Sequence, residues 1–183
     1  MRFFIIIYIC VIIQRLLELR LAKRNERTLR AKGAVEYGAK HYKWIVLLHS
    51  LFLVSLGLEV AVRRPELATW EIAPLSIFIF CQIFRIWVLT SLGPFWNTKI
   101  MVLPGAEVVI KGPYRYIKHP NYLVVALEIL ALPLIFQAYF TALVFSLLNA
   151  CLLLGVRIPT EEQALRERTD YNESLVGQRF KKE

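Results

Sequence analysis

The sequence predicts an all-α integral membrane protein with about five transmembrane helices. Hydrophobic residues make up 57% of the 183 residues, which is more than a soluble domain of this length carries. They also lie in long blocks, and most basic residues lie between alternate blocks. We therefore expect a single membrane domain over residues 1–183, with three spans in 1–92. Residues 93–183 are expected to form a polar loop, a helical hairpin and a cytoplasmic tail.

Five apolar blocks are the predicted spans, and a helix needs about 20 residues to cross the hydrocarbon core. The second, third and fifth blocks approach this length, and the first is close to the lower limit. The fourth is short and lies between Pro120 and Pro133, so it is expected to be tilted, kinked or tucked against a neighbour. In chain order the blocks are Phe3–Leu19, Trp44–Val62, Ile72–Leu92, Tyr122–Ile135 and Ala138–Val156.

The first block is predicted to be a permanent span rather than a cleaved signal peptide. It has no small-x-small cleavage site and runs directly into a basic segment that begins at Arg20. Residues 14–31 favour a helix that continues past the membrane and ends before Gly33, a typical C-terminal stop.

The distribution of charge predicts the orientation in the membrane. Segments 20–43, 93–120 and 157–183 contain 8, 4 and 6 lysines and arginines, against three on the opposite side. Basic loops stay on the cytoplasmic side, so the N-terminus is expected outside and the C-terminus in the cytoplasm. The net charge of +9 thus indicates topology and contact with membrane lipids, not a nucleic-acid partner. In a bacterium this would be the cell membrane.

Several motifs are missing, and one loop is rich in turns. The chain has no dinucleotide-binding glycine pattern and no P-loop, and its three cysteines have no metal-type spacing, so no metal site is expected. Glycine–proline pairs predict turns throughout 93–120. Val108–Ile110 is the one strand-like run.

Two polar clusters flank the predicted hairpin. The first cluster is Gly112–Tyr122. Within it, Pro120 suits the first position of a helix, and His119 suits the capping position before it. The resulting helix N-terminus favours a carboxylate or phosphate. Further along that helix Glu128 is costly in a bilayer, so we expect it to pair with Arg85 or to line a polar pocket.

The second cluster is Arg157–Glu162, at the end of the fifth block. The hairpin returns it to the membrane face that holds the first cluster, which predicts a pocket on the cytoplasmic side. Arg157 and Glu161 have the spacing of a helical ion pair. Pro159 disfavours a helical conformation at the preceding residue, so a break is expected there.

At these clusters the chain resembles the isoprenylcysteine carboxyl methyltransferase family, which is related to phospholipid methyltransferases. The resemblance covers about residues 80–175, and Arg24-Asn25, Glu36-Tyr37-Gly38 and His41-Tyr42 are similar to bacterial members. Lys118 stands where the family often has arginine. The matching residues are Leu92-Gly93 with Trp96, Pro104-Gly105, Gly112-Pro113-Tyr114-Arg115-Tyr116, Lys118-His119-Pro120-Asn121-Tyr122, Arg157 and Glu161-Glu162.

The resemblance implies an enzyme that uses S-adenosylmethionine and a lipid-like acceptor that enters from the bilayer. It implies that Arg157 orients the acceptor, with Arg85 and Glu128 as further candidates to line its site. The residues that it implies around the cofactor are Glu107, Val108, Val109, Tyr114, His119, Pro120, Asn121, Tyr122 and Glu161.

The type of acceptor decides whether a base is needed. A carboxylate is ionised at neutral pH, whereas a phenol has a pKa of about 10 and would need a base. His119, Glu128 and Glu161 are the candidates. Phospholipid N-methylation, an NADPH-dependent sterol-type reductase and a non-catalytic membrane scaffold are the alternatives to O-methylation.

Overall fold

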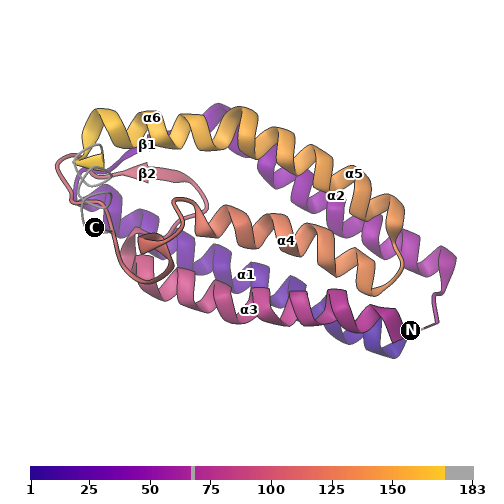
Figure 1. The fold of residues 1–183 in the computed structure, drawn as a ribbon. Coiled ribbons are helices and arrows are strands. Elements are labelled where there is room, and N and C mark those ends of the chain that lie inside the picture. The colour runs from indigo at the N-terminus through magenta and orange to yellow at the C-terminus, as the bar shows by residue number, and fades with distance from the viewer. Residues whose placement is uncertain (67–68, 172–183) are drawn as a thin grey trace.

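A computed structural model describes residues 1–66 and 69–171, and the remainder of the expected cytoplasmic tail, 172–183, lies outside the described residues. Six α-helices and one two-stranded sheet make up the described part (Figure 1). The helices are α1 (Arg2–Ala31), α2 (Ala39–Arg63), α3 (Ile72–Leu92), α4 (Pro120–Ile135), α5 (Tyr139–Leu152) and α6 (Ile158–Arg168), and the strands are β1 (Val35–Tyr37) and β2 (Ile100–Val102).

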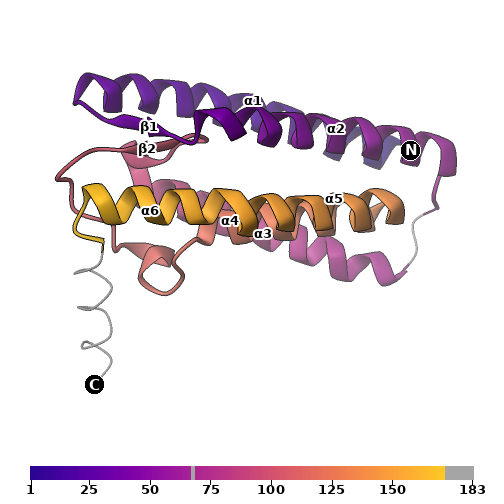
Figure 2. The ribbon, with the colours of Figure 1, turned by 90° about the horizontal axis from the view of Figure 1, so that it is seen from above.

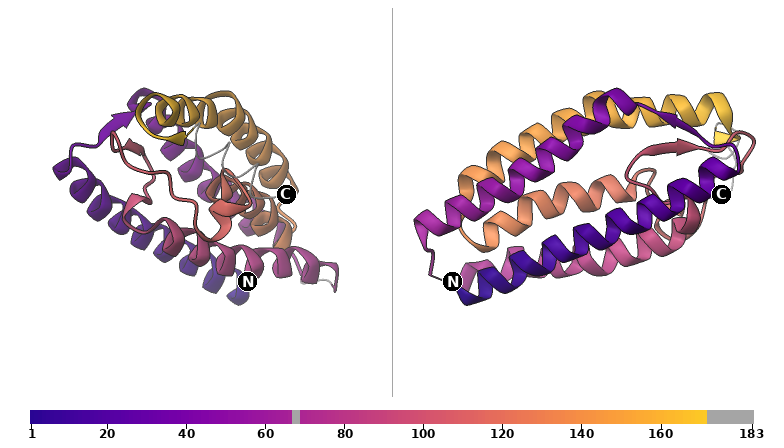
Figure 3. Two further views of the ribbon diagram at one scale, coloured as in Figure 1. Left: turned by 60° about the vertical axis from the view of Figure 1, so that its left-hand side comes forward. Right: turned by 180° about the vertical axis from the view of Figure 1, so that it is seen from behind.

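The long helices lie side by side along one axis (Figures 1 and 2). The N-terminus, the α2–α3 connection and the α4–α5 turn gather at one end of the bundle (Figure 3). The sheet, the α3–α4 loop and α6 lie at the other end. This arrangement brings the two polar clusters to the same end, as the hairpin predicted.

Three stretches of the described chain are long and apolar enough to cross a membrane: Ala39–Arg63, Ile72–Phe95 and Tyr139–Arg168. Many large apolar side chains on these helices are exposed, as expected for a surface that contacts lipid. The protein is therefore an integral membrane protein. The helices of the other two predicted spans are not among these stretches. α1 carries Arg15 and Glu18 in its apolar stretch, and α4 has 16 residues.

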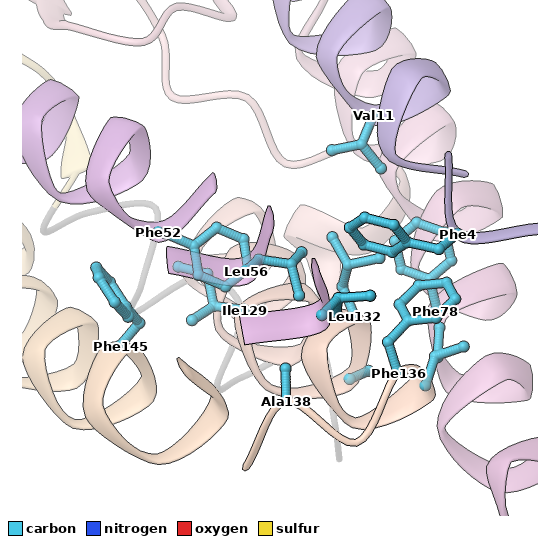
Figure 4. Packing of buried hydrophobic residues seen from close by; sticks show 13 residues of the cluster. Phe4, Val11, Phe52, Leu56, Phe78, Ile129, Leu132, Phe136, Ala138 and Phe145 are labelled. Carbon is cyan, nitrogen blue, oxygen red and sulfur yellow. The ribbon is translucent and has the colours of Figure 1, made fainter. Parts of the chain in front are cut away.

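An apolar core joins helices α1 to α5 and the α4–α5 turn near the N-terminal end of the bundle (Figure 4). Leu56 is fully buried, and the rings of Phe52 and Phe145 meet edge to face at 5.7 Å. This packing holds the helices together at one end of the bundle, and the same helices continue to the polar end. Labelled members of the cluster are Phe4, Val11, Phe52, Leu56, Phe78, Ile129, Leu132, Phe136, Ala138 and Phe145.

The strand prediction was wrong. Val108–Ile110 is not a strand, because the Val108 N–H donates to Asp170 Oδ1 at 2.8 Å instead of to a neighbouring strand. The sheet is formed by β1 and β2, which pair antiparallel with Glu36 opposite Met101.

The break predicted at Pro159 was also wrong. The chain stays helical from α5 into α6 through a π-helical segment, Leu153–Arg157, and Ile158 has helical φ and ψ of −62° and −49°. A proline removes one hydrogen bond and its ring crowds the carbonyl four residues earlier. The wider π turn accommodates both effects, so the helix continues.

Candidate active site

A pocket opens at the polar end of the bundle, between the α3–α4 loop, the start of α4, and the π-helical segment with α6. It holds about 1250 Å³ of empty space with its open mouth included. Arg157 lines it, as do eight of the nine residues predicted around a cofactor: Glu107, Val108, Val109, Tyr114, His119, Asn121, Tyr122 and Glu161. Pro120 does not line the pocket and instead begins α4.

The start of α4 is as predicted, with Pro120 at the first helical position and His119 as the cap. The preceding turn, Gly112–Arg115, brings Tyr114 to the pocket. Gly112 has φ +58°, and a Cβ there would lie 2.1 Å from Ser91 Oγ. Only glycine meets both requirements without strain, so this residue lets the turn pack against α3.

Arg157 is buried, and its guanidinium is held at two points. Nε donates to the Tyr122 hydroxyl at 3.0 Å, and Nη2 donates to the Thr98 carbonyl at 2.7 Å. Nη1 is buried without a hydrogen-bond partner among the described residues. The Tyr122 hydroxyl in turn donates to Glu161. Arg157 and Glu161 therefore meet through Tyr122, and the described contacts include no direct pair between them.

A second polar group surrounds Glu162. His119 Nε2 lies 3.0 Å from Glu162 Oε1, and Arg166 donates to Oε2 at 2.9 Å. The ammonium of Lys118 is 4.0 Å from the same carboxylate. The His119 ring also stacks on Tyr122, with ring centroids 5.6 Å apart. These contacts fix the imidazole at the edge of the pocket.

Tyr114 brings a phenol into the pocket. Burial raises the pKa of this phenol well above its ordinary value, so it stays protonated at neutral pH. Its hydroxyl has no hydrogen-bond partner within residues 1–66 and 69–171. Close by, Trp96 Nε1 lies 3.5 Å from Asn121 Oδ1. The pocket thus offers an unused hydroxyl and several ring faces.

Arg85 and Glu128 lie away from this pocket, in a separate buried cluster inside the bundle. Arg85 Nε donates to Glu128 Oε1 at 3.0 Å, Arg85 Nη1 to Glu18 at 3.2 Å, and Gln82 to Glu128 at 2.8 Å. Arg15 bridges Glu18 and Glu128. Two arginines and two glutamates balance in charge, and the cluster ties α1 to α3 and α4. Glu128 thus pairs with Arg85, and it also lines a second, small pocket beside Gln14 and His49, so both expectations for this residue hold.

Other pocket residues were not predicted from the sequence. Lys99 and the β2 residues line it, and the Thr98 carbonyl holds Arg157. Trp96 could have been found, because it belongs to the motif that carries the resemblance. A backbone carbonyl such as that of Thr98 has no signal in the sequence.

Within the described ranges, no group of three His, Cys, Asp or Glu side chains could hold a metal ion.

Comparison with known proteins relates the chain to a methyltransferase family and to two bacterial proteins. The sequence profile of the isoprenylcysteine carboxyl methyltransferase (ICMT) family matches residues 74–167. An uncharacterized protein of Bacillus subtilis (strain 168), YpbQ, is 47% identical over 86% of this chain and 93% of its own length. An uncharacterized protein of Haemophilus influenzae is 31% identical over 90% of this chain and 96% of its own length.

Proposed function

Because the chain belongs to the isoprenylcysteine carboxyl methyltransferase family, we propose that it is a membrane methyltransferase that uses S-adenosylmethionine. The acceptor is a carboxylate or phenolic oxygen of a lipid-like molecule. One observation carries the choice of oxygen: Arg157 lines the pocket, and its Nη1 is buried without a hydrogen-bond partner among the described residues. A buried cationic donor of this kind favours an anionic oxygen.

We also propose that the chain crosses the membrane five times, with its N-terminus outside and the pocket in the cytoplasm. The basic segments 20–43, 93–120 and 157–183 support this orientation. So does the grouping of the polar loops at one end of the bundle (Figure 1). The bacterial relatives support the cell membrane as the location. A soluble cofactor and a lipid-tailed acceptor can meet only at such a membrane face.

The pocket suits S-adenosylmethionine in its chemistry. Aromatic rings of Trp96, Tyr114 and Tyr122 offer faces for a purine. The dipole at the start of α4 favours a carboxylate, and Glu161 carries the charge that pairs with an ammonium. The cofactor supplies an electrophilic methyl group.

The contribution of the protein is mainly alignment. Two hydrogen bonds hold Arg157, so its free N–H can orient one acceptor oxygen toward the methyl group. A carboxylate needs no base. For a phenol, the neighbouring guanidinium would lower the pKa by stabilising the phenolate, and Glu161 or His119 would take the proton.

A binding test separates this function from the alternatives. S-adenosylhomocysteine, the product of the cofactor, should raise the melting temperature of the detergent-purified protein, whereas NADPH should not. Stabilisation by NADPH alone would favour the reductase, and no response to either would favour a scaffold. Incubation with methyl-labelled cofactor and a lipid extract then identifies the acceptor. A labelled amine lipid would indicate phospholipid N-methylation, which the positive charge of Arg157 disfavours.

A further inference from the structure

The segment 93–99, which follows α3, is held by the cytoplasmic end of α1. Asn25 Nδ2 donates to two of its carbonyls, that of Trp96 at 2.8 Å and that of Gly93 at 3.2 Å. Asn25 is buried, so each of these bonds is protected from competing water. The Trp96 N–H closes the turn on the Gly93 carbonyl at 3.1 Å, and a single side chain attaches this turn to α1.

Two more contacts attach the same segment to the same face of α1. Asn97 Nδ2 donates to the Ala22 carbonyl at 3.2 Å, and Lys99 Nζ donates to Glu26 Oε1 at 2.9 Å. The hydrogen bond with Glu26 raises the pKa of Lys99. Residues 22, 25 and 26 share a helical face by their i, i+3, i+4 spacing. Three residues of this face of α1 thus contact the segment around Thr98, and Glu26 also pairs with Arg30.

α2 holds the segment from another direction. The hydroxyls of Tyr42 and Thr98 lie 3.1 Å apart. The carbonyl of Thr98 accepts the 2.7 Å hydrogen bond from Arg157 Nη2. Thr98 therefore links Tyr42 to the guanidinium by two hydrogen bonds, one at its hydroxyl and one at its backbone carbonyl. With Nε fixed by Tyr122, the Thr98 carbonyl determines where the free Nη1 points.

We propose that Asn25 and Tyr42 are positioning residues that fix the orientation of the Arg157 guanidinium through the segment 93–99. Both lie outside residues 74–167, the part that matches the family profile. The N-terminal region thereby acts on the acceptor-binding group without touching the acceptor. The kinetic consequence rests on the function proposed above, whereas the structural link can be tested without it.

The structural test observes Arg157 directly. In a spectrum of ¹⁵N-labelled arginine side chains, the Arg157 Nε–H resonance is the one lost in Arg157→Lys. We expect Tyr42→Phe and Asn25→Ala to shift this resonance. The matched control is Tyr37→Phe on β1, which removes a hydroxyl that accepts a 2.9 Å hydrogen bond from Arg168 of α6. An unmoved resonance in Tyr42→Phe, or an equal shift in Tyr37→Phe, would overturn the proposal.

The kinetic test uses the lipid that the labelling experiment identifies. Tyr42→Phe should lower kcat/KM for that lipid about 10-fold, the effect of one lost hydrogen bond to an aligned group. The affinity for S-adenosylhomocysteine should stay within about twofold. In an Arg157→Lys background the effect of Tyr42→Phe should nearly vanish, because the shared partner is gone. An effect of the same size in both backgrounds would contradict the inference. Failure of the wild type to bind S-adenosylhomocysteine or to label any lipid would instead contradict the proposed function.

Discussion

The guanidinium of Arg157 is costly to bury, and two hydrogen bonds fix its orientation. Burying a guanidinium is unfavourable unless its N–H groups find partners. Here Nε and Nη2 have them, while Nη1 has none among the described residues. A side chain that is held at two points and unpaired at the third is prepared for a ligand. Under the proposed function, this preorganisation means that little reorganisation is needed when the anionic acceptor oxygen binds.

Replacing Arg157 should separate catalysis from cofactor binding. In Arg157→Ala we expect methyl transfer to fall by a factor of about 100 or more, because a preorganised charge is lost. Isothermal titration should show the affinity for S-adenosylhomocysteine within a few-fold of wild type. The control is Arg115→Ala, which removes an exposed arginine from the same polar end and should leave both unchanged. Loss of cofactor binding in Arg157→Ala would place Arg157 in the cofactor site instead.

Individual site residues were predictable to different degrees. Side chains such as His119, Tyr122 and Glu161 could be predicted, because a proline-marked helix start and the hairpin bring them together. The carbonyl of Thr98 could not, because every residue has one and only the folded loop selects it. Arg85 and Glu128 illustrate a different limit. Their pairing was one of two readings left open, but Arg15 and Glu18 of α1 are 67 or more residues away in sequence from their partners on α3 and α4.

At the scale of elements, the buried cluster explains why α1 is polar in the middle of its apolar stretch. Arg15 and Glu18 are costly in a bilayer unless they are paired within the bundle. Their partners on α3 and α4 provide this pairing and set the rotation of α1 about its axis. An entirely hydrophobic α1 would have no such preference for one rotation about its axis. Its apolar side chains could face lipid or protein at nearly the same free energy.

Breaking this cluster should destabilise the bundle more than removing a balanced pair. In Glu128→Gln, the buried Arg85 and the partly buried Arg15 lose a carboxylate, at a cost of roughly 3–5 kcal/mol in the free energy of unfolding. The double variant Arg85→Met/Glu128→Leu keeps the Arg15–Glu18 pair and should be clearly more stable than Glu128→Gln. Denaturant-induced unfolding in detergent measures the order. A Glu128→Gln protein with unchanged stability but lost methyl transfer would instead indicate a role at the acceptor site.

The long helices were predictable, and the short elements were not. Blocks of about 20 apolar residues leave few structural choices in a membrane. Strands β1 and β2 have three residues each and pair across more than 60 residues of sequence, so no local pattern marks them. The helix across Pro159 was missed because a rule about one residue does not foresee a compensating π turn.

At the scale of the whole molecule, the two ends of the bundle have different tasks. One end is an apolar core that holds the helices together, with Leu56 and Val60 fully buried. The other end carries the pocket and most of the unpaired polar groups of the described chain. This separation allows a stable scaffold and an open site in a single small domain.

Labelling of introduced cysteines would test the proposed topology. In a variant without the native cysteines, Arg2→Cys should react with a membrane-impermeant maleimide in intact cells. Lys111→Cys should react only after the cells are permeabilised, because the α3–α4 loop is expected in the cytoplasm. Gel-shift or mass analysis of the labelled protein gives the readout. The reverse pattern would invert the orientation, and protection of Arg2→Cys would remove α1 from the set of spans.

The π-helical segment Leu153–Arg157 has a consequence for how this chain can change over time. A π turn takes in about one residue more than an α turn, which rotates everything after it by about 100° relative to what precedes it. The π-helical segment therefore determines the angle about the helix axis between two faces. One is the face of α5 that packs in the membrane, and the other is the face of α6 that carries Glu161 and Leu165. A single-residue insertion or deletion at this point would change which α6 side chains face the pocket and would leave the transmembrane packing of α5 in place.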